Sequence, residues 1–259
     1  MEKIILSTKP NISELPGGWE PKLEQVKVTN RGTDDAIVIK KLIPGAFILE
    51  EILTEYACSK LKDLMKSSPN FEKVSVQGNK IKKDNKIGSI RTTMWSPELA
   101  EGFWEIISPT LHERIMSDDT LTDWWQNNPT RLNWTPVAIS PLLRFMKYGK
   151  NGKHYAHYDA GFIYPDDNYR TLQSFVVYLT TNSTGATRFI DDKQTGPIWN
   201  RKNEDWSKKA KSDEVLATSY PKEGNVLIFD HRMCHDVEKY LGKEGDRIII
   251  RGDIVYKAK

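Results

Sequence analysis

The sequence contains little cysteine and no long apolar run. Only two of its 259 residues are cysteines, Cys58 and Cys234, which argues against a framework of disulfide bonds. No apolar stretch approaches the roughly 20 residues that a membrane-spanning helix needs. The apolar run in MEKIILSTKPN is too short for a signal peptide. We therefore expect a cytoplasmic protein that makes no contact with a membrane.

An excess of charge of one sign is also absent. The formal net charge is +3, which neither requires nor excludes an acidic partner. The hydrophobic content of 38% is ordinary for a soluble protein, and 259 residues suit one large domain with a sizeable core. The chain has no internal repeat and no low-complexity segment.

The sequence does contain a pattern of metal-binding residues. His157 and Asp159 are one residue apart in KHYAHYDAG, and His235 follows 78 positions after His157 in HRMCHDVEKY. Residues i and i+2 of a strand point the same way, so the first two could hold one ion while a distant strand supplies the third ligand. Two imidazoles and one carboxylate form the facial triad of non-haem Fe(II) sites. A His-x-Asp pair alone is weak evidence, because satisfied surface or core pairs are common.

The segments around these residues have the patterns of strands. LLRFMKYGKNGKHYAHYDAG predicts a strand, a turn and a strand that leads into the first two ligands. SFVVYLT, GATRFI, EGNVLIFDHRMCHDV and DRIIIRGDIVY predict further strands, and the third of these ends at His235. Apolar spacing in PGAFILEEILTEYACSKLKDLMKSS predicts a helix through about Ser68, and ELAEGFWEIISPTLHERIMSDD predicts one or two more. The expected fold is mainly β with flanking helices.

The order of these parts resembles the Fe(II)/2-oxoglutarate-dependent oxygenases, specifically their prolyl 4-hydroxylase-like branch. His-x-Asp, Tyr-Leu-Thr, Gly-x-Thr-x-Phe, Gly-x-x-Leu-x-Phe, His and Arg occur in that family's order. The resemblance covers residues 140–256 well and residues 42–110 loosely. It implies a double-stranded β-helix, which is a cupin-like jelly roll. A cupin-like jelly roll that uses a similar site for another purpose is the alternative.

The resemblance implies a metal site. Neutral His157 and His235, together with ionised Asp159, would hold Fe(II), and O₂ would bind at an open position. His231 is a rival third ligand, because a gap of four residues to His235 would suit two ligands on a helix. The flanking VLIF and DVEKY segments have extended patterns, and Arg247 then falls at the family's distance, so we favour His235.

The resemblance also implies a cosubstrate site. The keto acid of 2-oxoglutarate would chelate the metal, and its far carboxylate would meet Arg247, twelve residues after His235, and Tyr178. A guanidinium suits this role because it stays charged and binds a carboxylate through two hydrogen bonds. Tyr148 and Thr187 are further candidates for this site. Ascorbate is the expected reductant in vitro.

Candidate substrate contacts follow from strand parity. In RIIIRGD, Arg251 and Asp253 share a face with Arg247, and Arg144 is in step with Tyr148 on the strand before His-x-Asp. Buried arginines need anionic partners. Either Asp253 pairs with them internally, or Arg251 or Arg144 receives a carboxylate of the substrate. The remaining candidate contacts are Arg91, Tyr155 and Trp199; Tyr155 shares parity with His157, whereas His154 and His112 are expected to be solvent or capping residues.

The domain organisation is predicted from composition. Residues 1–40 are polar, contain three prolines and are expected to form an N-terminal arm packed on the domain. Residues 41–259 would form one oxygenase domain with a jelly-roll core at about 140–256. The segment 190–221 is longer than a hairpin needs, which predicts an insertion or lid over the site. Trp124, Trp125 and Trp134 are expected to be packing residues.

The protein is predicted to be a dioxygenase. It would hydroxylate an unactivated C–H bond of a small polar or amino-acid-like substrate and release succinate and CO₂. We expect an anionic or zwitterionic small molecule as its partner. A protein hydroxylase of the prolyl type is the first alternative. An AlkB-like nucleic-acid demethylase is disfavoured, because that family's Arg-x5-Arg is here Arg247-x3-Arg251. The oligomeric state is not predicted.

Overall fold

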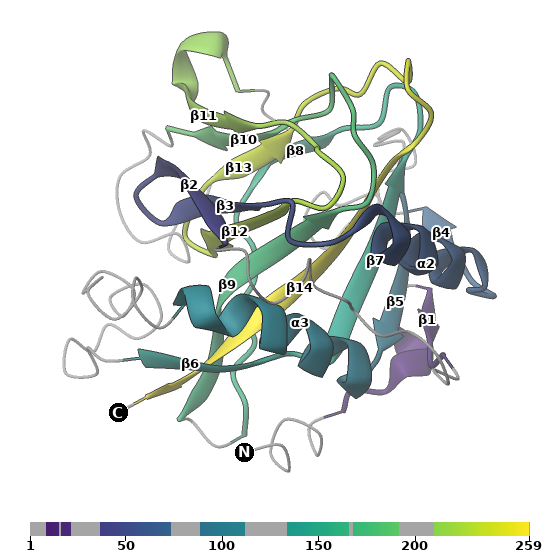
Figure 1. Ribbon diagram of the computed structural model, residues 1–259, viewed down its shortest axis with the longest axis vertical. Helices are drawn as coiled ribbons and strands as arrows, with labels where there is room; N and C mark the ends of the chain where they lie inside the picture. Colours follow the sequence, from purple (N-terminus) through teal and green to yellow (C-terminus); the bar gives the residue numbers. More distant parts are fainter. Residues whose placement is uncertain are drawn as a thin grey trace.

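The computed structural model describes residues 9–15, 17–21, 37–73, 89–111, 134–165, 168–191 and 210–258. In these ranges the chain forms two β-sheets and two α-helices (Figure 1). The smaller sheet packs against one face of the larger sheet, and the helices pack against its other face. We call these the inner face and the outer face of the larger sheet.

The larger sheet joins segments that are far apart in the sequence. Its strand order is β1-β5-β7-β14-β9-β12-β3-β2, with β4 paired to β5 and β6 paired to β14. The bounds are β1 Gly18–Trp19, β2 Val38–Ile43, β3 Ala46–Glu50, β4 Glu72–Lys73, β5 Ser89–Trp95, β6 Trp134–Ile139, β7 Leu142–Tyr148, β9 Tyr169–Tyr178, β12 Val226–Asp230 and β14 Arg247–Ala258.

The smaller sheet has four strands in the order β11-β10-β13-β8. Their bounds are β8 His154–His157, β10 Thr187–Ile190, β11 Val215–Ser219 and β13 His235–Val237. Two short 3₁₀ helices, η1 (Ile12–Glu14) and η4 (Ser212–Glu214), complete the described elements. From β7 to β14 the chain passes back and forth between the two sheets, with the paired strands β10 and β11 both in the smaller sheet, as in a jelly roll.

The outer face of the larger sheet forms the main apolar core with the helices α2 (Glu55–Lys66) and α3 (Pro97–Leu111). Thr54 begins α2, because its hydroxyl accepts a hydrogen bond from the Ala57 amide at 3.1 Å. Phe103 of α3 packs on Phe175 of β9, with ring centroids 5.5 Å apart. All ten residues of β9 are buried, because one face meets the helices and the other meets the smaller sheet.

The inner face is mixed in character. Apolar side chains of β9, β12 and β14 pack there against Phe189 of β10 and Val237 of β13. The same face also carries charged residues, and these gather where β5, β7 and β14 run side by side.

The strand predictions for the region after residue 140 are confirmed, with one correction. The segment EGNVLIFDHRMCHDV does not form one strand that ends at His235. It forms β12 in the larger sheet and β13 in the smaller sheet, with a turn between them, and His235 begins β13. The turn is required because the two strands belong to different layers.

The predicted first helix begins later than its apolar spacing suggested. Residues Ala46–Glu50 form β3, which pairs with β12 and β2, and the helix starts only at Glu55. Four of the five β3 side chains are buried, so burial on both faces of the sheet overrides a helical spacing. Trp134 is buried, as expected of a packing residue. Trp124, Trp125, His112, Trp199 and most of the predicted lid lie outside the described residues.

Part of the N-terminal segment lies against the domain. β1 pairs in parallel with β5. β2 spans Val38–Ile43, so it includes the predicted boundary at residue 40 between the arm and the domain. No helix in the described part of the chain is long and apolar enough to cross a bilayer.

Candidate metal centre

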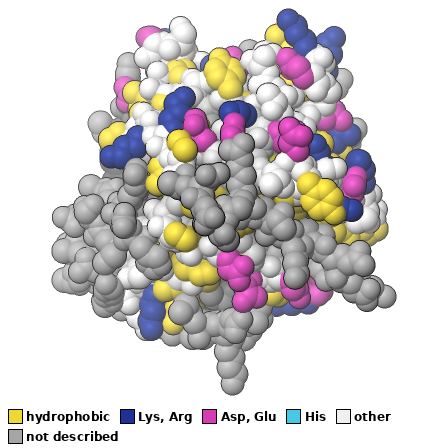
Figure 2. Space-filling model, viewed as in Figure 1, with side chains coloured by type: hydrophobic (Ala, Val, Ile, Leu, Met, Phe, Trp, Pro, Cys, Tyr) yellow, Lys and Arg dark blue, Asp and Glu magenta, His cyan; other side chains and the backbone are white. Residues whose placement is uncertain are grey.

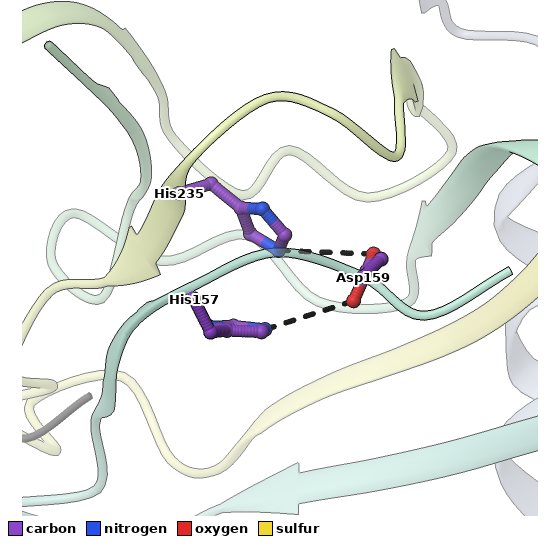
Figure 3. Close-up of side chains that lie close together, drawn as sticks. All are labelled: His157, Asp159 and His235. Carbon is purple, nitrogen blue, oxygen red and sulfur yellow. Dashed lines mark ion pairs between the residues drawn. The ribbon is translucent and has the colours of Figure 1, made fainter. Parts of the chain in front are cut away.

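His157, Asp159 and His235 come together at the end of the smaller sheet (Figure 3). His157 is the last residue of β8 and lies opposite His235 of β13 in the strand pairing. Asp159 follows two residues after the end of β8 and is buried. One ligand atom from each residue lies within 4.8 Å of the others. The three predicted ligands therefore form one group that could hold a metal ion.

The orientation of both imidazoles is fixed by the backbone. Nδ1 of His157 lies 2.7 Å from the Tyr155 carbonyl oxygen, and Nδ1 of His235 lies 3.0 Å from the Met233 carbonyl oxygen. A carbonyl oxygen can only accept, so each Nδ1 carries the proton and donates it. In the neutral ring this leaves the Nε2 lone pair free to bind a metal.

Both Nε2 atoms face the Asp159 carboxylate. The distances are 3.6 Å from His157 Nε2 to Oδ1 and 3.8 Å from His235 Nε2 to Oδ2, which are too long for hydrogen bonds. The space between these three groups therefore suits a cation with two nitrogen ligands and one oxygen ligand. Such a donor set fits a divalent first-row metal with open coordination positions.

The protonation states favour the same role. Burial, reinforced by His157, lowers the pKa of His235 to about 3, so its ring is neutral. Burial alone would raise the pKa of Asp159, but Arg251 and the neighbouring histidines outweigh it, and this pKa lies well below its usual range. A neutral imidazole and an ionised carboxylate are the forms that bind metals.

Arg251 contacts the carboxylate of the candidate metal ligand Asp159. Its Nη2 lies 3.0 Å from Asp159 Oδ2, and Ser174 Oγ donates to the same oxygen at 2.6 Å. Arg251 also pairs with Asp253 at 3.1 Å, and Arg144 pairs with Asp253 at 2.9 Å. Arg144 and Arg251 thus have internal anionic partners, which was one of the two possibilities that strand parity left open.

His231 is not part of the metal-binding group. It is fully buried, and its Nε2 lies 3.3 Å from Asp253 Oδ1. It follows directly after β12 in the larger sheet, whereas His235 belongs to the smaller sheet. The two histidines therefore occupy different layers.

His154 is a cavity residue that the sequence analysis misplaced. Its ring lies 4.0 Å from the His157 ring, centroid to centroid, and both rings line the cavity. The reason is a bulge in β8: three residue steps from His154 to His157 lie opposite two steps on β13. Tyr155 is accordingly not among the described lining residues, and Lys153 lies over its ring instead. A bulge of this kind is not visible in strand parity.

Arg247 lies deep in the same cavity and is fully buried. Its Nη2 donates to Thr187 Oγ1 at 3.3 Å, and its guanidinium lies over the Tyr148 ring, 4.7 Å from the centroid. Nε and Nη1 of Arg247 have no hydrogen-bond partner, and no described carboxylate forms an ion pair with it. A buried guanidinium without an anion is costly, so this end of the cavity suits an anionic ligand.

Tyr178 lies near Arg247, with its ring centroid 5.8 Å from the guanidinium carbon. Its hydroxyl donates to Thr187 Oγ1 at 3.2 Å and lies 3.0 Å from Ser219 Oγ, and Tyr178 is not among the described residues that line the cavity. Gly185, with φ +77°, lets the backbone pass close to Arg247, since a Cβ there would lie 3.1 Å from Arg247 Cδ.

The cavity that contains the metal-binding group has a volume of about 290 Å³. Of the predicted residues, it brings together the triad, Arg247, Tyr148, Thr187, Arg91, Arg144 and Arg251. Asp253 is not among the described lining residues, but it pairs with Arg144 and Arg251. The apolar lining residues, which the sequence analysis did not single out, are Met146, Val176, Phe229, Val237 and Ile249.

No protein-family model and no curated protein matches the sequence, but solved structures do match this structure. A prolyl hydroxylase from Trichoplax adhaerens, in complex with a peptide fragment of the hypoxia inducible factor oxygen degradation domain, is 13% identical with a TM-score of 0.51, covering 82% of this chain and 84% of that chain.

Two further structures match at lower TM-scores. The viral collagen prolyl hydroxylase of Paramecium Bursaria Chlorella virus-1 is 15% identical with a TM-score of 0.46, covering 83% of this chain and 96% of that chain. HygX from Streptomyces hygroscopicus, with nickel and 2-oxoglutarate bound, is 14% identical with a TM-score of 0.44, covering 83% of each chain. The match to the Trichoplax protein shows that the two chains share a fold. The predicted jelly roll with flanking helices is confirmed, and the resemblance to prolyl hydroxylases holds at the level of the fold.

Proposed function

We propose that this protein is an Fe(II)- and 2-oxoglutarate-dependent dioxygenase that hydroxylates a C–H bond of a small polar or amino-acid-like substrate. One observation carries the proposal. A single cavity contains two imidazoles with free Nε2 atoms beside an ionised carboxylate, and also a fully buried arginine with no anionic partner among the described residues. The first group suits a divalent metal, and the second suits the far carboxylate of a dicarboxylic acid.

His157, Asp159 and His235 would hold the metal. The Tyr155 and Met233 carbonyl oxygens keep each imidazole in the tautomer with a free Nε2, and Ser174 and Arg251 hold one oxygen of Asp159. When bound, Fe(II) with 2-oxoglutarate and O₂ supplies the oxidant for C–H hydroxylation and releases succinate and CO₂. The residues of this chain supply binding, orientation and exclusion of water.

Arg247 would bind the far carboxylate of 2-oxoglutarate. Nε and Nη1 are free to donate, and the Thr187 hydroxyl lies beside the guanidinium. Arg251, which contacts the ligand Asp159, lies four residues further along the same face of β14, or about 13 Å away at the rise of a strand. The cavity therefore offers a cationic end and a metal end with room for an elongated dianion between them.

The apolar lining limits access of water between these two ends. Met146, Val176 and Ile249 are side chains of neighbouring strands on the inner face, and Phe229 packs edge-on against the His235 ring at 4.6 Å between centroids. A dry cavity strengthens the interaction between a bound carboxylate and Arg247, because the local dielectric constant is low.

Binding of metal and cosubstrate tests the proposal before a substrate is known. Anaerobic protein is mixed with Fe(II) and then with 2-oxoglutarate, and we expect the visible absorption that appears when a 2-oxo acid chelates Fe(II). Asp159→Ala should lose this absorption. Arg247→Ala should require a much higher concentration of 2-oxoglutarate. If wild-type protein shows no such absorption and no 2-oxoglutarate-dependent succinate formation in the presence of Fe(II) and ascorbate, the proposed function is wrong.

A peptide side chain is the alternative substrate. The Trichoplax protein that shares this fold was crystallised with a peptide fragment, which is the observation in its favour. Succinate formation measured across free amino acids, peptides and nucleotides separates the two classes. Stimulation by peptides alone would favour the protein hydroxylase, and stimulation by free amino acids or related acids would favour the small-molecule enzyme.

A further inference from the structure

The lining of the cavity contains more cations than the proposed reaction uses. Arg91, Arg144, Arg247 and Arg251 all line it. The described carboxylates that contact these arginines are Asp159 and Asp253, which pair with Arg144 and Arg251. In the proposed function a divalent metal and dianionic 2-oxoglutarate bring opposite and equal charges, so their binding leaves the excess of positive charge unchanged.

Arg91 is the lining arginine that has no ion-pair partner among the described residues and no proposed role in cosubstrate binding. Its Nε is buried without a hydrogen-bond partner, and no described carboxylate lies within ion-pair distance of its guanidinium. Glu72 lies opposite Arg91 in the pairing of β4 with β5, but no ion pair joins them. The Arg91 guanidinium therefore faces the cavity as an unneutralised cation.

The surroundings make this cation unfavourable without a ligand. Burial is the main cause that lowers the pKa of Arg91, and repulsion by Arg144 and Arg251 adds to it, so that the pKa falls to about 10. The side chain still carries its charge at neutral pH. A bound anion would offset both the burial and the repulsion.

Some surface cations of the same chain have carboxylate partners. Lys62 pairs with Glu223 at 2.8 Å, and Lys222 pairs with Glu51 at 2.8 Å. On the face drawn in Figure 2, described Lys and Arg side chains lie among Asp and Glu side chains. Water hydrates a surface cation whether or not a carboxylate is near it, whereas Arg91 is partly buried, so the lack of a described carboxylate is costly at Arg91.

The strand register places Arg91 beside the proposed cosubstrate site. Arg91 lies opposite Met146 of β7, which lies opposite Ile249 of β14, midway between Arg247 and Arg251. Two strand spacings separate β5 from β14, so the Arg91 backbone is displaced sideways by about 10 Å. A molecule that contacts Arg91 can therefore occupy the cavity next to 2-oxoglutarate without replacing it.

We propose that Arg91 binds an anionic group, a carboxylate or a phosphate, of the substrate that is hydroxylated. This inference rests on the proposed function and narrows its substrate class to anions. Arg251 pairs with Asp159 and Asp253, and Arg144 pairs with Asp253, so both arginines already have internal anionic partners. Arg91 forms no ion pair with a described carboxylate, so a bound anion would neutralise its charge.

The first experiment uses inorganic sulfate as the probe. Protein saturated with Mn(II) and 2-oxoglutarate is titrated with millimolar sulfate at constant ionic strength, and the melting temperature is followed, because a ligand of the folded state raises it. We expect a saturable rise in wild-type protein and its loss in Arg91→Gln. Lys147→Gln is the matched control, because it removes one cation from the neighbouring strand at a surface pair with Asp246. It should respond as wild type does.

The outcomes separate the two proposals. If the melting temperature does not respond to Mn(II) and 2-oxoglutarate, the proposed function fails. If it responds to them but wild-type protein shows no saturable response to sulfate, or Arg91→Gln keeps that response, only the anion site at Arg91 is wrong.

The second experiment identifies the anion. Succinate formation is measured with N-acetyl amino acids, with their primary amides and with phosphate monoesters. We expect acids or phosphate esters to stimulate turnover, and we expect Arg91→Gln to raise the KM of these anions by about ten-fold or more while leaving that of neutral amides unchanged. Arg91→Lys should recover part of the loss because it keeps the charge. Stimulation by amides alone, or an equal loss for acids and amides in Arg91→Gln, would overturn the proposal.

Discussion

The two faces of the larger sheet differ in what their side chains do, although the same strands form both. Along β14, Ile248, Ile250 and Ile254 pack toward the helices, while Arg247 and Arg251 face the cavity. The outer face is apolar and closed by α2 and α3. The inner face contains the charged residues of the proposed site. Stability and chemistry are thus separated by the alternation of a strand, and substitutions on the two faces should give different results.

The largest effect is expected at the metal ligands. His157→Ala, Asp159→Ala and His235→Ala should each abolish turnover and Fe(II) binding while the melting temperature changes little, because the main core lies on the other side of the sheet. Metal binding and succinate formation are the measurements. His231→Ala is the comparison, and a result in which it alone loses metal binding would show that His231 is the third ligand.

The converse is expected on the outer face. Ile250→Ala should lower the free energy of unfolding by about 2–5 kcal/mol, since it removes a fully buried side chain from the core against the helices. Denaturant unfolding measures this, and the affinity of the folded protein for 2-oxoglutarate should remain. Its neighbour Ile249 lines the cavity, so Ile249→Ala should alter cosubstrate or substrate affinity. Equal effects of the two substitutions on both measurements would contradict the division between the faces.

A smaller effect is expected at Arg247. Arg247→Ala should raise the KM for 2-oxoglutarate, because a charge-assisted hydrogen bond is worth about 1.5–3 kcal/mol, or roughly ten-fold to a hundred-fold in affinity. Fe(II) affinity serves as the control and should remain near that of wild type, since Arg247 makes no described contact with the triad. An unchanged KM would rule out this role.

An effect of about the same size as at Arg247, but on metal affinity, is expected at Arg251. Arg251→Ala removes the cation that holds Asp159, and partners of metal ligands typically contribute about ten-fold to a hundred-fold in metal affinity. Arg251→Lys should restore part of that affinity. A loss confined to the KM of the substrate, with Fe(II) affinity unchanged, would instead make Arg251 a substrate contact.

The ligands and most strands could be predicted because local patterns determine them. A linear sequence shows directly a His-x-Asp pair, apolar runs of strand length and the order of the segments. Arg247 was predicted from its distance to His235, Thr187 lies in the Gly-x-Thr-x-Phe segment, and both line the cavity. The first helix was predicted too long, since a buried strand such as β3 and the start of a helix share the same apolar composition.

The partners of the charged residues depend on strands that are distant in sequence, and only the tertiary structure determined them. Parity placed Arg144, Arg251 and Asp253 on one face but left their partners open, and the fold resolved this by bringing Asp159 to Arg251. Because β8 contains one extra residue, the His154 side chain lines the cavity and the Tyr155 side chain does not. A linear sequence specifies which residues can ligate or carry charge, whereas the register between strands determines which charges remain for a ligand to neutralise.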